Sequence, residues 1–183
     1  MRLFVGLAVS DAVKEALERL TLRLRAKDDG LRWSTPDQWH VTLVFLGEVD
    51  DEARARLVRE LAQVWQPALT LRMESLGVFQ RTGILHAQVE VTPELLRLYE
   101  AVAAAVKRAG LEVEDRPYRA HITLARSRNR DGRKTMERLQ RTVENREQQR
   151  LRERWDVAEF LLYESQLSPR GSTYVVRERF GLS

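Results

Sequence analysis

The chain reads HVTLVFLG at residues 40–47 and HITLAR at residues 121–126. Both stretches begin with His-x-Thr-Leu, with a β-branched residue at x, and both lie in runs of strand-forming residues. Side chains two residues apart on a strand point to the same face, about 7 Å apart along the backbone. Each copy therefore presents an imidazole beside a hydroxyl and turns its other apolar residues toward a core. The four polar residues are His40, Thr42, His121 and Thr123.

Two of the three histidines in the chain occupy matching positions in these tetrapeptides. A single histidine in an apolar strand is most often a hydrogen-bonded core residue, and we interpret the third, His86, in this way because no threonine stands two residues later. The pair favours chemistry instead. An imidazole titrates at about pH 6.5 and acts as acid or base, and two hydroxyls can hydrogen-bond the oxygens of a tetrahedral anion between them.

Length and composition restrict the class of protein. With 183 residues and 43% hydrophobic residues, the chain is long enough to bury a substantial core. Without cysteine it forms neither disulfides nor thiolate metal sites. The apolar N-terminal stretch is short and lacks the features of a signal peptide, and no segment reaches the length of a membrane span. We expect a cytoplasmic protein without membrane contact.

The positive charge is concentrated in one segment. Residues 126–154 contain eleven Lys or Arg and five acids, a local charge of +6, whereas the whole chain carries +4. Such a field attracts phosphates and polyanions, although most of the segment also fits a solvated helix face with ion pairs. Arg126 is the exception, because it lies two residues past Leu124, at the end of the second His-x-Thr-Leu stretch.

Hydrophobic periodicity and turn residues predict an alternation of helices and strands. Helices are expected at residues 11–27, 51–66, 93–109 and 134–150. Strands are expected at residues 2–9, 31–33, 40–47, 69–79, 84–91, 119–125, 155–168 and 172–180, with a short extended piece at 111–113.

The order of these elements indicates an internal repeat. A helix, a turn, a short extended piece and a His-x-Thr-Leu strand occur twice, and the two histidines lie 81 residues apart. We therefore expect residues 1–183 to form a single bilobal α+β domain. Its two pseudo-symmetric lobes would each be a mainly antiparallel sheet flanked by helices, with the active-site cleft between them.

The paired motifs resemble those of the 2H phosphoesterase superfamily. Within it, the chain is most similar to the bacterial and archaeal RNA 2′,3′-cyclic phosphodiesterases, also called 2′-5′ RNA ligase-like proteins. The resemblance runs over nearly the whole length, although Ala120 stands where this group usually has proline. Further matching residues are Arg2-Leu3-Phe4-Val5, Trp33, Pro36, Tyr163-Glu164-Ser165, Pro169, Gly171 and Tyr174.

The resemblance implies a hydrolysis that needs neither metal nor cofactor. His40 and His121 would be the acid–base pair, and the two threonines, Thr42 and Thr123, would hold the phosphate oxygens. Arg126 would add a positive charge at the phosphate. Phe45 would stack on the terminal base, an interaction that tolerates any sequence.

The implied substrate is RNA with 2′,3′-cyclic phosphate ends, with tRNA fragments among the candidates. We assign His40 as the acid that protonates the leaving 3′ oxygen and His121 as the base on water, although the near symmetry of the site leaves the opposite assignment open. With an RNA 5′-hydroxyl in place of water, the reverse reaction would make a 2′-5′ link. No apolar stripe remains unused, so we expect a monomer.

Three rival functions fit the sequence less well. A non-catalytic RNA-binding module could use the basic segment 126–154, but binding alone needs no second histidine. A metal hydrolase would have to complete its ligand shell with carboxylates, and no H-E-x-x-H spacing occurs. A serine hydrolase lacks the G-x-S-x-G motif.

Overall fold

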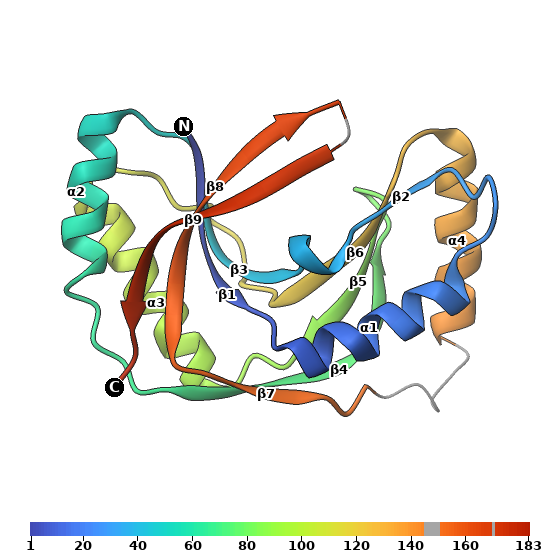
Figure 1. Cartoon of the computed structure of the whole chain (residues 1–183), viewed down its shortest axis with the longest axis horizontal. Helices are drawn as coiled ribbons and strands as arrows, with labels where there is room; N and C mark the ends of the chain where they lie inside the picture. The colour runs from blue at the N-terminus through green and yellow to red at the C-terminus, as the bar shows by residue number, and fades with distance from the viewer. Residues whose placement is uncertain (145–150, 170) are drawn as a thin grey trace.

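The computed structural model describes residues 1–144, 151–169 and 171–183 (Figure 1). It confirms the expected α+β fold, with two antiparallel sheets and helices on their flanks. Each His-x-Thr-Leu stretch lies on a strand of a different sheet, as the two-lobed arrangement requires.

The first sheet has four strands in the order β3-β1-β8-β9, and all neighbouring strands are antiparallel. β3, which carries the first motif, is an edge strand beside β1. The four strands are β1 (Arg2–Ala8), β3 (His40–Glu48), β8 (Glu159–Ser168) and β9 (Gly171–Gly181).

The second sheet has five strands in the order β2-β6-β5-β4-β7, again with antiparallel neighbours. β6, which carries the second motif, lies between β2 and β5. The five strands are β2 (Leu31–Trp33), β4 (Leu69–Phe79), β5 (Ile84–Val89), β6 (His121–Ser127) and β7 (Arg154–Val157).

Side-chain caps begin three of the helices at or beside the residues expected from the sequence. The side chains of Ser10, Asp50 and Thr92 accept hydrogen bonds from backbone N–H groups in the first helical turn. The helices are α1 (Asp11–Leu24), α2 (Asp51–Leu61), α3 (Pro93–Arg108) and α4 (Arg130–Glu144), with a 3₁₀ turn, η1, at Pro36–Gln38. In Figure 1, α2 and α3 lie beside the four-stranded sheet, and α1 and α4 lie on the side of the five-stranded sheet.

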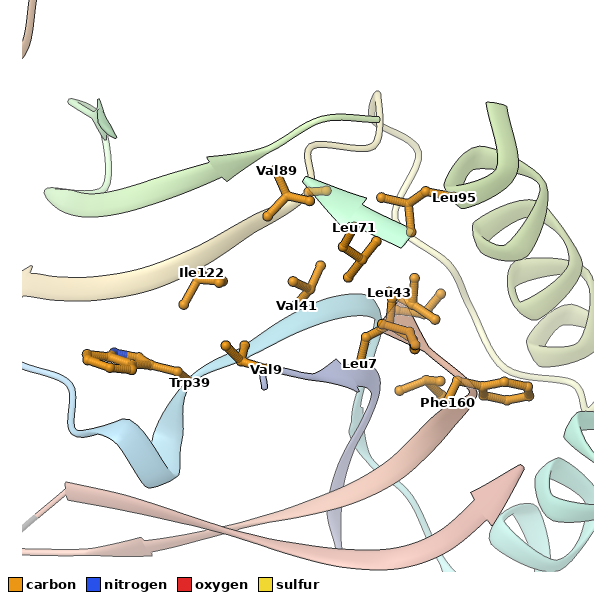
Figure 2. Close-up of a cluster of buried hydrophobic side chains, with 14 of the residues drawn as sticks. Leu7, Val9, Trp39, Val41, Leu43, Leu71, Val89, Leu95, Ile122 and Phe160 are labelled. Carbon is orange, nitrogen blue, oxygen red and sulfur yellow. The ribbon is translucent and has the colours of Figure 1, made fainter. Parts of the chain in front are cut away.

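A shared apolar core joins the two sheets. Val41 and Leu43 of β3 and Ile122 and Leu124 of β6 are all at most 4% exposed and belong to one cluster of buried side chains. Figure 2 shows Val41 and Ile122 directed into this cluster, together with Leu71 of β4. Because successive side chains alternate across a strand, burial of these residues turns the histidines and threonines to the opposite face.

The lobes are interleaved along the chain, which the repeat of elements did not reveal. The expected single strand 155–168 is wrong: it divides at Ala158 into β7, which pairs with β4, and β8, which pairs with β1. β7 stays in the five-stranded sheet because Trp155 and Val157 alternate with exposed residues and bury their side chains there. The chain thus crosses from one sheet to the other at this point.

Several element boundaries also differ from the expected ones. α1 ends at Leu24 rather than near residue 27, and α2 ends at Leu61. α4 begins at Arg130, and its expected extension over residues 145–150 lies outside the described residues. The piece 111–113 is irregular rather than a strand.

Candidate active site

The two His-x-Thr-Leu strands lie against each other although they belong to different sheets. β3 and β6 are in contact, and the apolar residues of both enter the shared core. His40, Thr42, His121 and Thr123 are all partly buried, so each retains some exposure on the face away from that core. The four polar residues predicted from the sequence therefore lie on two strands in contact, on the faces turned away from the shared core.

Matching hydrogen bonds fix both imidazole rings. Nδ1 of His40 lies 2.8 Å from the carbonyl oxygen of Gln38, and Nδ1 of His121 lies 2.7 Å from that of Arg119. A carbonyl oxygen only accepts, so Nδ1 carries the proton in both rings. In the neutral tautomer each Nε2 is then left with a lone pair, which is the form a general base requires.

The two threonines differ in what they contact. Nε2 of His40 lies 3.0 Å from the hydroxyl oxygen of Thr42, which donates to it in the tautomer just described. Among the described residues, His121 forms a hydrogen bond through Nδ1 but none through Nε2. The two motifs are thus alike in how the ring is held and unlike in how Nε2 is used.

A β-bulge in each motif brings a third residue to the same face. On β3, Thr42 pairs with Gly6 and Phe45 pairs with Phe4, and the register shifts between these two pairs. Because paired residues in an antiparallel sheet point to the same side and Phe4 lies two residues from Gly6, Phe45 shares the face of Thr42. A regular strand would have turned it to the opposite face. Phe45 is 50% exposed, and its ring centroid lies 5.9 Å from that of Phe4.

The second motif repeats this device with Arg126. Thr123 pairs with His86, and Arg126 pairs with Ile84, across a register shift between Leu85 and His86. Arg126 therefore lies on the face of Thr123 and is exposed. In both motifs the sequence pattern His-x-Thr-x-x-X places residue X beside the threonine.

Burial and charge both keep the imidazoles neutral. Burial, as the largest cause, lowers the pKa of His40 from 6.5 to about 4. The hydrogen bond to the Gln38 carbonyl raises this pKa, whereas the charges of His121 and Arg126 lower it further. Burial also lowers the pKa of His121, with further lowering from Arg126 and Arg116. The charge of Arg126 thus lowers the pKa of both rings. The unliganded pair is therefore neutral at pH 7, and a bound phosphate would favour its protonation.

Aromatic rings surround His40. Its ring centroid lies 4.6 Å from that of Phe4 and 4.9 Å from that of Tyr174, which meets it edge-on. Phe4 in turn stacks on Tyr163 at 4.9 Å. The sequence motifs included these aromatic residues, but strand pairing between distant segments was needed to place them around the imidazole.

His86 lies beside His121, which its position in the sequence did not indicate. It is 5% exposed, its ring stacks on Phe79 with centroids 3.9 Å apart, and its centroid lies 5.4 Å from that of His121. Its Nδ1 is buried without a hydrogen-bond partner among the described residues. Burial lowers the pKa of His86 to about 4, so the ring is neutral. Only the pairing of β5 with β6 would have indicated that His86 lies beside His121.

The basic segment 126–154, where the structure describes it, spans several elements. It comprises the end of β6, α4, and the first residue of β7, while residues 145–150 lie outside the described part. On α4, Lys134 pairs with Asp131 at 3.8 Å, and Met136 is buried. Acidic and basic side chains together line a hollow along this helix, namely Asp28, Asp131, Lys134, Glu137, Arg138 and Arg141. The described part of the segment thus has mixed charge.

Residues 1–144, 151–169 and 171–183 lack two further features. They contain no group of three His, Cys, Asp or Glu side chains that could hold a metal ion. None of their helices combines the length and the apolar character needed to cross a membrane.

Comparison with known proteins gives a consistent family. A model of the 2′-5′ RNA ligase superfamily matches residues 9–168. A Thermus thermophilus protein named RNA 2′,3′-cyclic phosphodiesterase is 31% identical, over 100% of this chain and 90% of its own length. An Archaeoglobus fulgidus protein of the same name is 31% identical over 72% of this chain and 75% of its own length.

Solved structures with the same fold include Escherichia coli LigT complexed with 3′-AMP. It superposes with a TM-score of 0.81 at 24% identity, covering 100% of this chain and 98% of LigT. The protein TT0787 of Thermus thermophilus has a TM-score of 0.76 at 27% identity, covering 99% of this chain and 97% of its own.

Proposed function

Because this chain belongs to the 2′-5′ RNA ligase superfamily, we propose that it is a phosphodiesterase that hydrolyses RNA 2′,3′-cyclic phosphate ends to 2′-phosphate ends. The name shared by its relatives supports the substrate class. The observation that carries the chemistry is the matched pair of imidazoles, each held at Nδ1 by a carbonyl oxygen so that Nε2 is available for proton transfer.

The reaction needs two proton transfers on opposite sides of the phosphorus. His121 removes a proton from water, whose oxygen forms a new bond to phosphorus. The bond from phosphorus to the 3′ oxygen breaks, and His40 donates a proton to that oxygen. Each transfer is typically worth about 10²- to 10⁴-fold in rate. In the active form, the pair therefore carries one proton more than two neutral imidazoles, and this proton is on Nε2 of His40. After turnover His40 is neutral and His121 carries the additional proton.

The remaining residues of the face bind the phosphate and the base. Hydroxyls of Thr42 and Thr123 donate to the phosphate oxygens, and Arg126 balances the charge that develops there. Phe45, half exposed on the same face, stacks on the terminal base. The histidines supply both proton transfers, so this mechanism requires no metal.

The same pair supports 2′-5′ ligation. When an RNA 5′-hydroxyl replaces water, its oxygen forms the new bond to phosphorus, the bond to the 3′ oxygen breaks, and the product is a 2′-5′ phosphodiester. The two proton transfers are unchanged. The residues assigned above bind the phosphate and one terminal base, and none of them is assigned to a second RNA strand. We therefore expect water to be the more frequent attacking group and hydrolysis to dominate.

Product analysis tests the proposal. The chain should convert a short RNA ending in a 2′,3′-cyclic phosphate to the 2′-phosphate, in the presence of a strong chelator, and His40→Ala and His121→Ala should each abolish turnover while remaining folded. Binding of the RNA without turnover would instead support a binding module. A single histidine variant with near-normal activity would refute the paired mechanism.

A leaving-group experiment assigns the two roles. A cyclic substrate with sulfur in place of the bridging 3′ oxygen expels a thiolate, which needs no proton donor. This substrate should restore turnover to His40→Ala and not to His121→Ala. The opposite pattern would exchange the roles of the two histidines.

A further inference from the structure

A cavity of about 630 Å³ adjoins the site beside Arg126. Its volume lies in the range of roughly 300–1,000 Å³ found for small-molecule sites. Besides Arg126, it is lined by Arg32 of β2, by Ser127 at the end of β6, by Arg128 directly after it, and by Pro169 directly after β8. It thus combines residues of both lobes, and the mechanism above uses only one of them.

The arginines of this cavity are arranged at a cost to the fold. Arg32 and Arg126 are direct partners in the register of β2 and β6, so their side chains share one face. Like charges directly opposite each other on paired strands are destabilising. Among the described residues, no acidic side chain forms an ion pair with Arg32, Arg126 or Arg128. An anion between these side chains would remove the repulsion.

The position of the cavity fits a polymer that continues from the reacting end. Thr123 and Arg126 pair with residues two apart on β5, so their backbones are separated by about 7 Å along the sheet. A terminal phosphate held at Thr123 therefore leaves the next group of the strand within reach of the arginines. Phosphate oxygens are the acceptors that guanidinium groups bind best.

We propose that Arg32 and Arg128, together with Arg126, bind the phosphodiester on the 5′ side of the terminal nucleotide, so that the enzyme prefers an RNA strand to a cyclic mononucleotide. This inference rests on the proposed function, and it adds a substrate preference that the histidine pair does not provide. The cavity is the subsite for the strand, and the His-x-Thr pair is the subsite for its end.

The test compares adenosine 2′,3′-cyclic phosphate with the dinucleotide ApA ending in a 2′,3′-cyclic phosphate. The measured quantity is the ratio of kcat/KM for the dinucleotide to that for the mononucleotide. Arg32→Gln and Arg128→Gln should each lower this ratio roughly fivefold, as expected for loss of one exposed charge contact. In a plot of log kcat/KM for the dinucleotide against log salt concentration, each substitution should also make the negative slope shallower by about 0.7. Arg59→Gln removes the same charge from α2, which lies across the molecule from β2 (Figure 1), and should leave the ratio unchanged.

Binding measured without turnover separates the two proposals. Affinities for ApA ending in a 2′-phosphate and for adenosine 2′-phosphate should give the same loss of preference in Arg32→Gln. If the unsubstituted enzyme turns over both substrates and the ratios in Arg32→Gln match it, the strand subsite is wrong and the proposed function stands. If neither substrate is turned over, the proposed function fails. The strand subsite is then tested by the ratio of the affinity for ApA ending in a 2′-phosphate to that for adenosine 2′-phosphate, and it is wrong if Arg32→Gln leaves this ratio unchanged.

Discussion

The hydroxyl of Tyr118 donates a hydrogen bond to the main-chain carbonyl oxygen of Thr42, 3.0 Å away. Tyr118 precedes β6 by three residues, whereas Thr42 lies within β3, so the bond connects the first His-x-Thr motif to the segment that leads into the second. The ring of Tyr118 stacks on that of Tyr99 in α3, with centroids 4.3 Å apart. Burial raises the pKa of the Tyr118 hydroxyl above its usual value, which keeps it protonated as a donor. This contact ties the segment before the second motif to the strand that carries the first.

Tyr118→Phe should weaken that connection while keeping the stacked ring. The Thr42 carbonyl then loses its donor, and we expect the free energy of unfolding to fall by about 1–2 kcal/mol. We also expect a lower kcat with little change in KM, because the phosphate-binding hydroxyl of Thr42 loses its fixed position. Urea unfolding and steady-state kinetics measure both effects. Tyr99→Phe keeps the bond and serves as the control; an equal loss in both variants would show that the bond has no special part.

The pH dependence of kcat/KM should have its optimum on the acid side of pH 6.5. Burial lowers the pKa of both His40 and His121 below 6.5, and the active pair carries one proton, so that form is most abundant between two lowered macroscopic values. Arg126→Gln removes a positive charge that lowers both values, so the optimum should move to higher pH as kcat/KM falls. Arg59→Gln is the control for net charge, and an optimum that stays in place in Arg126→Gln would contradict the electrostatic coupling.

The threonines should contribute less than the histidines. Thr42→Val and Thr123→Val keep the β-branched shape that suits a strand and delete only the hydroxyl. Loss of a hydrogen bond to a charged group costs about 1–3 kcal/mol, or roughly 5- to 150-fold in kcat/KM. The matched serine variants keep the hydroxyl and should retain most of the activity. A valine variant as active as its serine counterpart would remove that threonine from the site.

The sequence predicted the face of each motif but not what shares it. Alternation within a strand was sufficient to orient His40 and Thr42, because it depends only on neighbouring residues. Placing Phe45 and Arg126 on the same face depends on bulges, which arise from register with β1 and β5 and which regular strand alternation does not predict. The contact of His86 with His121 likewise depends on strand pairing, here of β5 with β6, and could not be predicted from neighbouring residues.

Topology was limited in the same way. Turn and periodicity signals predicted the existence of most elements, but the division of residues 155–168 at Ala158 depends on which sheet offers each half a partner. Pairing between distant strands is decided by packing of the whole core. It therefore could not be derived from the order of elements alone.

Gly77→Ala should destabilise the fold through His86. A methyl group at residue 77 would lie 2.7 Å from Cε1 of the buried His86 ring, too close without a shift of the strand or the ring. Such overpacking typically costs about 1–3 kcal/mol. In the His86→Ala background the ring is absent, so the added methyl should cost clearly less, and the double variant should be non-additive. Additive losses in urea unfolding would mean that another contact limits residue 77.

His86→Phe should make the protein less sensitive to acid. The pKa of His86 is about 4 in the fold against 6.5 for the unperturbed group, so between these values the unfolded chain binds a proton that the folded chain excludes. Stability should therefore fall as the pH decreases from 6.5 toward 4, by up to roughly 3 kcal/mol from this residue. Phenylalanine retains a ring that stacks on Phe79 and cannot be protonated, so the difference in unfolding free energy between pH 7.5 and pH 5 should shrink. Leu85→Met, on the same strand, should keep the original difference. If His86→Phe loses as much stability in acid as the unsubstituted protein does, the buried ring is not the group responsible.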